Sequence, residues 1–212
     1  MHVRRPRDER GVTLTEVLVV VVLLGVIMVP LGNALIGYIR HSDAVSRRLG
    51  ESHDVQISAA YFAQDVQSIG VRDWTTHPFP LKQSIELNVA PTGGLFPCGA
   101  SGTPNAVIRL AWDDPANTAN TIRVAYVVMT VGGERQLKRL TCNGSSTPSS
   151  TIVLAHNLDA AAPTVTCSTP TTCTDPDVPQ KVRLTLRIID PVNAAAGDPP
   201  VVVNLEGQRR QT

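Results

Sequence analysis

The fold of this chain follows from its residues 11–39, which read GVTLTEVLVVVVLLGVIMVPLGNALIGYI. No residue from Val17 to Ile39 is charged, and this run of 23 residues would span roughly 35 Å as a helix. That length matches the hydrocarbon core of a bilayer, whereas a core strand is far shorter and a soluble helix has a polar face. The run therefore predicts a membrane-crossing helix near the N-terminus.

The charges around this run point in one direction. Four arginines lie among residues 1–11, against Asp8 and Glu9, which favours a cytoplasmic N-terminus. Arg40, Arg47 and Arg48 follow the run and weaken that asymmetry. The 212 residues carry a formal net charge of +1 and are 42% hydrophobic and 17% charged. This composition excludes a coiled-coil rod and a charged disordered chain, and it gives no global case for nucleic-acid binding.

Two ordinary explanations of the run leave Glu16 unexplained. A secretory signal peptide has a shorter apolar stretch and a small-residue cleavage site, and the nearest match, around Gly32 and Ala34, is poor. A plain membrane anchor fits the length of the run. Neither explains a carboxylate at its start, because a charge in the membrane costs about 3 kcal/mol or more and usually has a partner.

Residues 11–16, GVTLTE, and the apolar run after them resemble the N-terminal signature of type IV prepilins and type II secretion pseudopilins. The resemblance implies that residues 1–11 are a leader ending in Gly11. A prepilin peptidase would cut after Gly11, and the new N-terminal residue, Val12, would be N-methylated. Val12 departs from the Phe or Met that is more usual there. Glu16 is then the fifth residue of the mature chain and its signature acid.

The resemblance also implies a role for Glu16 and a set of partners. In this family the acid is thought to pair with the N-terminal amine of a neighbouring subunit, which eases the transfer of the helix from lipid into a fibre core. The alternative is that Glu16 only caps the membrane helix at the interface. The implied partners are the prepilin peptidase, other pilins or pseudopilins with their assembly machinery, and the lipid bilayer. The implied location is the cytoplasmic membrane and then a pilus or pseudopilus.

Beyond the membrane segment the pattern becomes that of an amphipathic helix. Apolar residues recur at positions 55, 59, 62, 66 and 69, which form one helix face, and Gly70 is a plausible stop. We therefore expect one helix over 13–69, with a transmembrane and assembly part over 12–39 and an amphipathic continuation over 40–70. Its weak points are Gly25, Pro30, Gly32 and Gly37, because proline removes a backbone hydrogen bond and glycine lowers helix propensity.

Residues 71–212 read as an extracytoplasmic β-rich domain. The predicted strands cover residues 84–89, 106–112, 121–131, 135–141, 151–154, 181–189 and 200–205. Gly132 and Gly133 between two of them indicate a hairpin, and no helical pattern interrupts them. Residues 142–150 and 163–179 read as loops. The sequence thus predicts an α+β, pilin-like fold with a long helix packed on an antiparallel sheet.

A second, looser resemblance concerns the subfamily. The segment YFAQDV at 61–66 ends the helix, a strand with Tyr126 precedes a turn and the segment QLKRL at 136–140, and a strand with an arginine-containing tail ends the chain. This arrangement is similar to that of the larger minor pilins and the J-type pseudopilin of type II secretion.

The cysteines form an even set beyond the membrane segment. Cys98, Cys142, Cys167 and Cys173 lie on the side expected outside the cytoplasm, which favours disulfides. Three connectivities exist, of which we favour Cys167–Cys173 with Cys98–Cys142. A zinc site is disfavoured because no Cys-x-x-Cys pair occurs and the histidines are not spaced with the cysteines.

Other polar groups give weaker signals. The stretch 113–120, with Asp113 and Asp114, could offer oxygen ligands to calcium, as could Asp175 and Asp177, but a polar turn fits both better. Lys138, Arg139, Arg209 and Arg210 could form a basic patch for DNA, although solvated strand ends fit better.

No cluster of serine, histidine and acid indicates catalysis, and the sequence points to no cofactor and no metal. The function expected is that of a minor pilin or pseudopilin, a structural subunit and not an enzyme. The alternatives are a single-pass anchored binding module that does not polymerise and, ranked last, a secreted enzyme.

Overall fold

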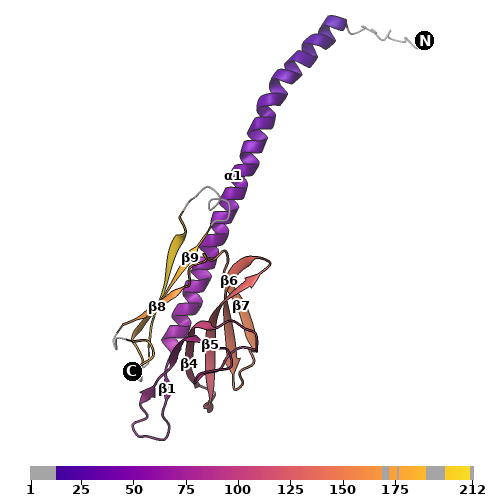
Figure 1. The fold of residues 1–212 in the computed structure, drawn as a ribbon. Helices are drawn as coiled ribbons and strands as arrows, with labels where there is room; N and C mark the ends of the chain where they lie inside the picture. The colour runs from indigo at the N-terminus through magenta and orange to yellow at the C-terminus, as the bar shows by residue number, and fades with distance from the viewer. Residues whose placement is uncertain (1–12, 169–171, 176, 190–198, 211–212) are drawn as a thin grey trace, which may run out of the picture. The chain divides into compact units, whose positions relative to one another are not determined.

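The computed structural model describes residues 13–168, 172–175, 177–189 and 199–210, apart from the side chains of residues 40, 43–49 and 51. The chain divides into two compact units, Met1–Leu49 and Gly50–Thr212. The fold is the predicted α+β, pilin-like arrangement of one long N-terminal helix and antiparallel sheets (Figure 1).

Helix α1 covers Leu14–Ser68, 55 residues, within one residue of the prediction at each end. It is helical through Pro30, whose missing N–H therefore does not end it. It stops before Gly70, which has a positive φ of 142° and whose N–H bonds to the carbonyl of Ala111. In the second unit the predicted face is buried, with Phe62, Val66 and Ile69 all fully inaccessible.

A five-stranded antiparallel sheet has its strands in chain order. It contains β3 (Ile85–Val89), β4 (Ala106–Asp114), β5 (Asn117–Val131), β6 (Glu134–Asn143) and β7 (Ser150–Ala155). Gly132 and Gly133 form the β5–β6 turn with φ of 60° and 87°, which confirms the predicted hairpin. Positive φ at both central residues matches the strand twist and excludes most other residue types.

A three-stranded antiparallel sheet has the order β10-β9-β8. Its strands are β8 (Thr164–Cys167), β9 (Lys181–Ile188) and β10 (Val201–Gln208). The expectation of a loop over 163–179 is wrong for β8. This strand has four residues and little apolar content, so its pairing with β9, from Thr164 opposite Thr185 to Cys167 opposite Val182, defines it and local pattern does not. The two-residue strands β1 (Val71–Arg72) and β2 (Leu81–Lys82) also lacked a pattern.

The core of the second unit lies where the end of α1 meets both sheets. The ring of Phe62 meets Tyr126 of β5 edge to face at 5.5 Å, and Ser58 donates a hydrogen bond of 2.8 Å to the carbonyl of Leu154 in β7. On the other side, Gly207 of β10 lies directly against the side chain of Val66. Helix and sheets therefore share one apolar core.

This close approach at Gly207 predicts the effect of adding one methyl group. In Gly207→Ala the new Cβ would overlap the β-branched side chain of Val66, which has no freedom to move aside. We expect the free energy of unfolding to fall by about 1–3 kcal/mol in urea unfolding of the full chain in detergent. Gly93→Ala is the control, because a Cβ there meets Ala90 at an ordinary 3.7 Å. Equal stability of the two variants would contradict this packing.

Candidate functional site

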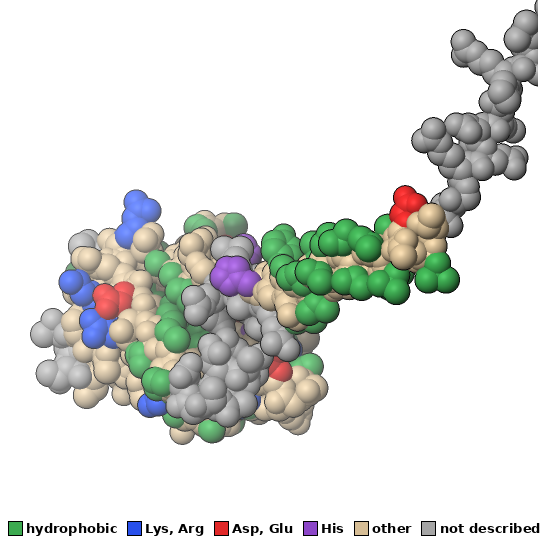
Figure 2. All heavy atoms as spheres, turned by 90° about the horizontal axis from the view of Figure 1, so that it is seen from above, with side chains coloured by type: hydrophobic (Ala, Val, Ile, Leu, Met, Phe, Trp, Pro, Cys, Tyr) green, Lys and Arg blue, Asp and Glu red, His purple; other side chains and the backbone are tan. Residues whose placement is uncertain are grey.

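The first candidate site is the apolar part of α1. The stretch Leu14–Ile39 is long and apolar enough to cross a membrane, with 26 residues and a mean hydropathy of 2.7. None of this stretch is buried, so its large side chains, such as Leu18, Leu24 and Ile36, are all exposed. Figure 2 shows these hydrophobic side chains as a continuous surface along the helix. Such a surface fits a membrane anchor.

Glu16 lies in the first turn of α1. Thr13 caps this turn: its carbonyl and its hydroxyl accept from the Glu16 N–H at 3.0 and 3.4 Å. A carboxylate here is favoured by the helix dipole. Glu16 is also the one charged residue within 13–39. Its acid therefore stands at the start of the apolar surface. The predicted cleavage and methylation residues, Gly11 and Val12, lie outside the described residues.

The glycines of the apolar stretch meet no neighbouring atoms. A Cβ built on Gly25, Gly32 or Gly37 would find nothing within 4 Å. No contact within the described chain therefore requires a glycine at these positions. Small residues on a membrane helix allow close approach of a second helix, and that use stays a prediction.

A buried ionic cluster joins α1 to the five-stranded sheet. The Asp65 carboxylate accepts from Arg139 Nε at 2.7 Å and Nη2 at 2.6 Å, and from the Tyr126 hydroxyl at 2.6 Å. Arg139 also donates to Thr141 at 2.7 Å and lies 5.1 Å from the ring centre of Tyr61. The side chains of Asp65 and Arg139 are 2% and 12% exposed, so both charges are nearly removed from water and depend on each other.

The electrostatics of this cluster follow from burial and pairing. Burial raises the pKa of Tyr126 well above its ordinary value, and the Asp65 charge and hydrogen bond add to the rise. Burial would lower the pKa of Arg139, but the hydrogen bonds and charge of Asp65 outweigh it and the pKa is raised. Tyr126 therefore stays a donor and Arg139 stays a cation.

Sequence reasoning quoted these residues but did not bring them together. Tyr126 and Arg139 stand opposite each other in the β5–β6 register, and Asp65 lies between Phe62 and Val66 on the buried face of α1. An acid on the apolar face of a helix was the available signal. It requires a partner, and the partner was not identifiable from spacing alone.

A second buried pair supports a loop. Arg109 is fully buried and donates to Glu86 at 3.0 Å and to the carbonyls of Ala90 and Gly93 at 2.7 and 2.8 Å. Glu86 accepts in turn from the N–H groups of Leu95 and Phe96. Burial lowers the pKa of Arg109, and the charge of Glu86 opposes the shift. The pair fixes the connection between β3 and β4.

The four cysteines form two disulfides, Cys98–Cys142 and Cys167–Cys173, the pairs that the sequence favoured. Their Cα atoms lie 5.7 and 5.2 Å apart. The first bridge ties the β3–β4 connection to the end of β6, and the second closes the loop after β8. Each closes a loop of the unfolded chain, which stabilises the fold by about 2–4 kcal/mol.

The acidic stretch 113–120 forms the β4–β5 turn. Asp113 accepts from the N–H of Arg72 at 3.0 Å, Asp114 from the N–H of Ala116 at 2.9 Å, and Asn117 from the N–H of Ala119 at 3.1 Å. Within the described residues no group of three or more His, Cys, Asp or Glu side chains could hold a metal ion.

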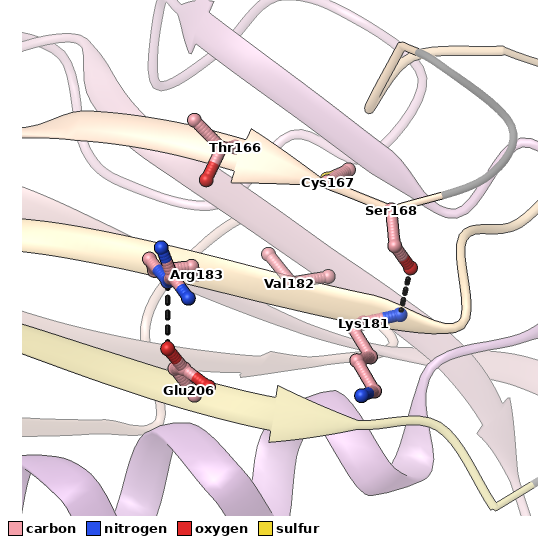
Figure 3. Close-up of a pocket in the computed structure, with 7 residues that line it drawn as sticks. All are labelled: Thr166, Cys167, Ser168, Lys181, Val182, Arg183 and Glu206. Carbon is pink, nitrogen blue, oxygen red and sulfur yellow. Dashed lines mark hydrogen bonds and ion pairs between the residues drawn. The ribbon is translucent and has the colours of Figure 1, made fainter.

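A shallow groove of about 220 Å³ crosses the outer face of the three-stranded sheet (Figure 3). Arg183 and Glu206 pair across it at 2.6 Å, and the Ser168 hydroxyl accepts from the backbone N–H of Lys181 at 3.0 Å. These groups already have partners, so the groove offers a ligand little beyond the ammonium of Lys181.

Comparison with known proteins places the N-terminal segment. Residues 6–32 match the family model for the prokaryotic N-terminal methylation motif. No curated protein and no solved structure matches the chain. The matched residues contain Gly11, Val12 and Glu16 and enter the apolar surface of α1. With this motif, the long apolar helix and the α+β fold, the chain belongs with the type IV prepilin-like proteins.

Proposed function

We propose that the chain is a structural subunit, a minor pilin or pseudopilin, made as a membrane-inserted precursor. A prepilin peptidase cuts after Gly11 and Val12 is then methylated. The subunit assembles through α1 into a type IV pilus or a type II secretion-like pseudopilus. Its role is mechanical and not catalytic. The observation that carries the proposal is the lone acid Glu16, placed in the first turn of an unburied apolar helix within the matched motif.

The chemistry of this arrangement is coherent. Cleavage at Gly11 creates an amine at Val12, about one helical turn from Glu16. An amine and a carboxylate on neighbouring subunits neutralise each other when their helices leave the membrane for a fibre core, where either charge alone would be strongly unfavourable. The apolar surface of α1 serves both environments, since it is compatible with lipid and with packing against other apolar helices.

The topology and subfamily belong to the same proposal. Arginines in the leader favour an N-terminus in the cytoplasm, which puts the disulfide-bonded β-domain on the outer side of the cytoplasmic membrane. The joined cluster of Asp65, Tyr126 and Arg139 comes from the segments that resemble the larger minor pilins and the J-type pseudopilin. We assign the chain to that group of subunits.

Glu16→Ala tests the role of the acid. Insertion into the membrane should be unchanged, because the apolar stretch is intact. Incorporation into fibres should fall about tenfold or more, since an unpaired amine is then buried between helices. The measurement is the amount of the chain in sheared fibres relative to membranes, by immunoblot.

Thr15→Ala is the matched control, because it alters a neighbouring position without removing a charge. Normal incorporation of Glu16→Ala would remove the proposed role of the acid. A protein that keeps its leader and never enters fibres would instead be a single-pass anchored binding module.

A further inference from the structure

The hairpin that follows α1 has a highly organised tip. Strands β1 and β2 are joined by residues 73–80, and the carboxylate of Asp73 accepts from the N–H and hydroxyl of Thr75 and from the hydroxyl of Thr76. These hydrogen bonds lower the pKa of Asp73. The Asp73 N–H bonds to the carbonyl of Pro80, and the Phe79 N–H bonds to that of Thr76. The tip therefore holds one conformation.

This tip presents aromatic rings to solvent. Trp74 is 47% exposed and Phe79 is 36% exposed, with their ring centres 5.4 Å apart, and His77 meets Phe79 edge on at 5.4 Å. Phe79 has a φ of 62°, a left-handed conformation that a bulky residue rarely adopts. Such strain costs about 1–3 kcal/mol and is retained where a residue's position has a use.

Positive charge surrounds the base of the hairpin. Arg72 donates to the carbonyl of Phe79 at 3.1 Å, and Lys82 lies on β2. Burial and the nearby charge of Arg72 lower the pKa of Arg209, and the buried Arg209 Nε has no hydrogen-bond partner among the described residues. The carboxylates on this surface are Asp73, bound within the tip, and Asp113. Cations therefore outnumber acids here once Arg210 is included.

A groove continues this surface. It measures about 530 Å³ and is lined by Trp112, Asp113 and Arg210 together with Gln64 and Gln67 of α1. Asp113 connects it to the hairpin, because its carboxylate accepts from the N–H of Arg72. Both tryptophans of the chain thus lie on one surface, separated by arginine side chains.

We propose that this surface binds single-stranded nucleic acid, with bases stacked on Trp74 and Phe79 and phosphates at Arg209 and Arg210. Exposed aromatic faces beside a cationic track are the combination that holds unpaired bases and their backbone. The proposal is independent of whether the chain assembles into fibres.

Two other anionic polymers fit less well. An acidic polysaccharide needs hydrogen-bond partners for its hydroxyl groups, but the polar groups of the tip already bond to one another. Duplex DNA keeps its bases stacked inside the helix, where an aromatic side chain cannot reach their faces. The observations favour the single strand.

The surface differs from the basic patch expected from sequence. Arg139 is held by Asp65 in the buried cluster and is not available to a ligand. Arg209 instead lies near Arg72, which the sequence did not single out.

Binding of fluorescein-labelled fifteen-nucleotide oligo-dT to the full chain in detergent, followed by anisotropy, tests the proposal. Trp74→Ala should raise Kd about tenfold or more, the usual loss for one stacked base. Phe79→Gly should weaken binding similarly while leaving the protein as stable or more so, because glycine accepts the positive φ. The double variant Arg209→Gln/Arg210→Gln should reduce the slope of log K against log salt by about 1.

Two matched variants control for general effects. Leu95→Ala removes an exposed apolar side chain elsewhere, and Lys181→Gln removes a cation from the outer face of the three-stranded sheet (Figure 3). Both should bind as the unaltered chain does. The proposal is overturned if Trp74→Ala and Phe79→Gly keep their affinity, if duplex DNA binds as tightly as the single strand, or if polygalacturonate competes equally per charge.

Discussion

Replacing Asp65 by asparagine is expected to lower the free energy of unfolding by about 3–5 kcal/mol, because it leaves the Arg139 charge buried without its counter-ion. Asparagine keeps the size of the side chain, so packing around Phe62 is preserved and the loss reports the charge. Both Arg139 contacts of 2.6 and 2.7 Å and the Tyr126 hydrogen bond depend on this carboxylate. Urea unfolding of the full chain in detergent, followed by near-UV circular dichroism, measures the change.

The matched control is an exposed ion pair of the same domain. Arg183 and Glu206 are 53% and 57% exposed and also lie 2.6 Å apart, yet Glu206→Gln should change stability by only about 0–1 kcal/mol. Burial and not distance separates the two pairs. If Asp65→Asn were no more destabilising than Glu206→Gln, the helix would not be held to the sheet by this cluster.

Gly11→Ala is expected to leave the chain unprocessed when it is produced together with its prepilin peptidase. The matched motif at residues 6–32 contains this glycine, and the resemblance makes it the last residue of the leader. The unprocessed chain should still insert into the membrane, because the apolar stretch Leu14–Ile39 is unchanged. Gel mobility and intact mass of the membrane fraction separate the two forms.

A glycine inside the apolar stretch provides the control. Gly25→Ala adds a methyl group where nothing lies within 4 Å, so processing should continue as in the unaltered chain. Normal cleavage of Gly11→Ala would show that the processing site has been assigned to the wrong residue.

The elements with strong local signals were predictable from the sequence. A 23-residue uncharged run followed by a helical apolar face gives α1, and alternation with a glycine-glycine turn gives β5 and β6. The local chemistry of Glu16 was also readable, because an isolated charge beside an apolar run is unusual in itself.

Features that depend on contacts between distant segments were not predictable. Strand β8 exists through its pairing with β9, and Asp65 finds Arg139 74 positions along the chain. The pairing of Glu86 with Arg109 likewise depends on the register of β3 and β4, in which the two residues stand opposite each other. The aromatic tip at 73–80 is polar and proline-containing in sequence, and its hydrogen bonds become visible only in the folded hairpin.

Mass spectrometry of the N-terminus of the protein isolated from cells with the cognate peptidase tests the prepilin assignment most directly. The account predicts an N-terminal peptide that begins at Val12 and carries one added methyl group on its amine. A peptide that still contains residues 1–11, or one that begins near residue 35, would contradict it.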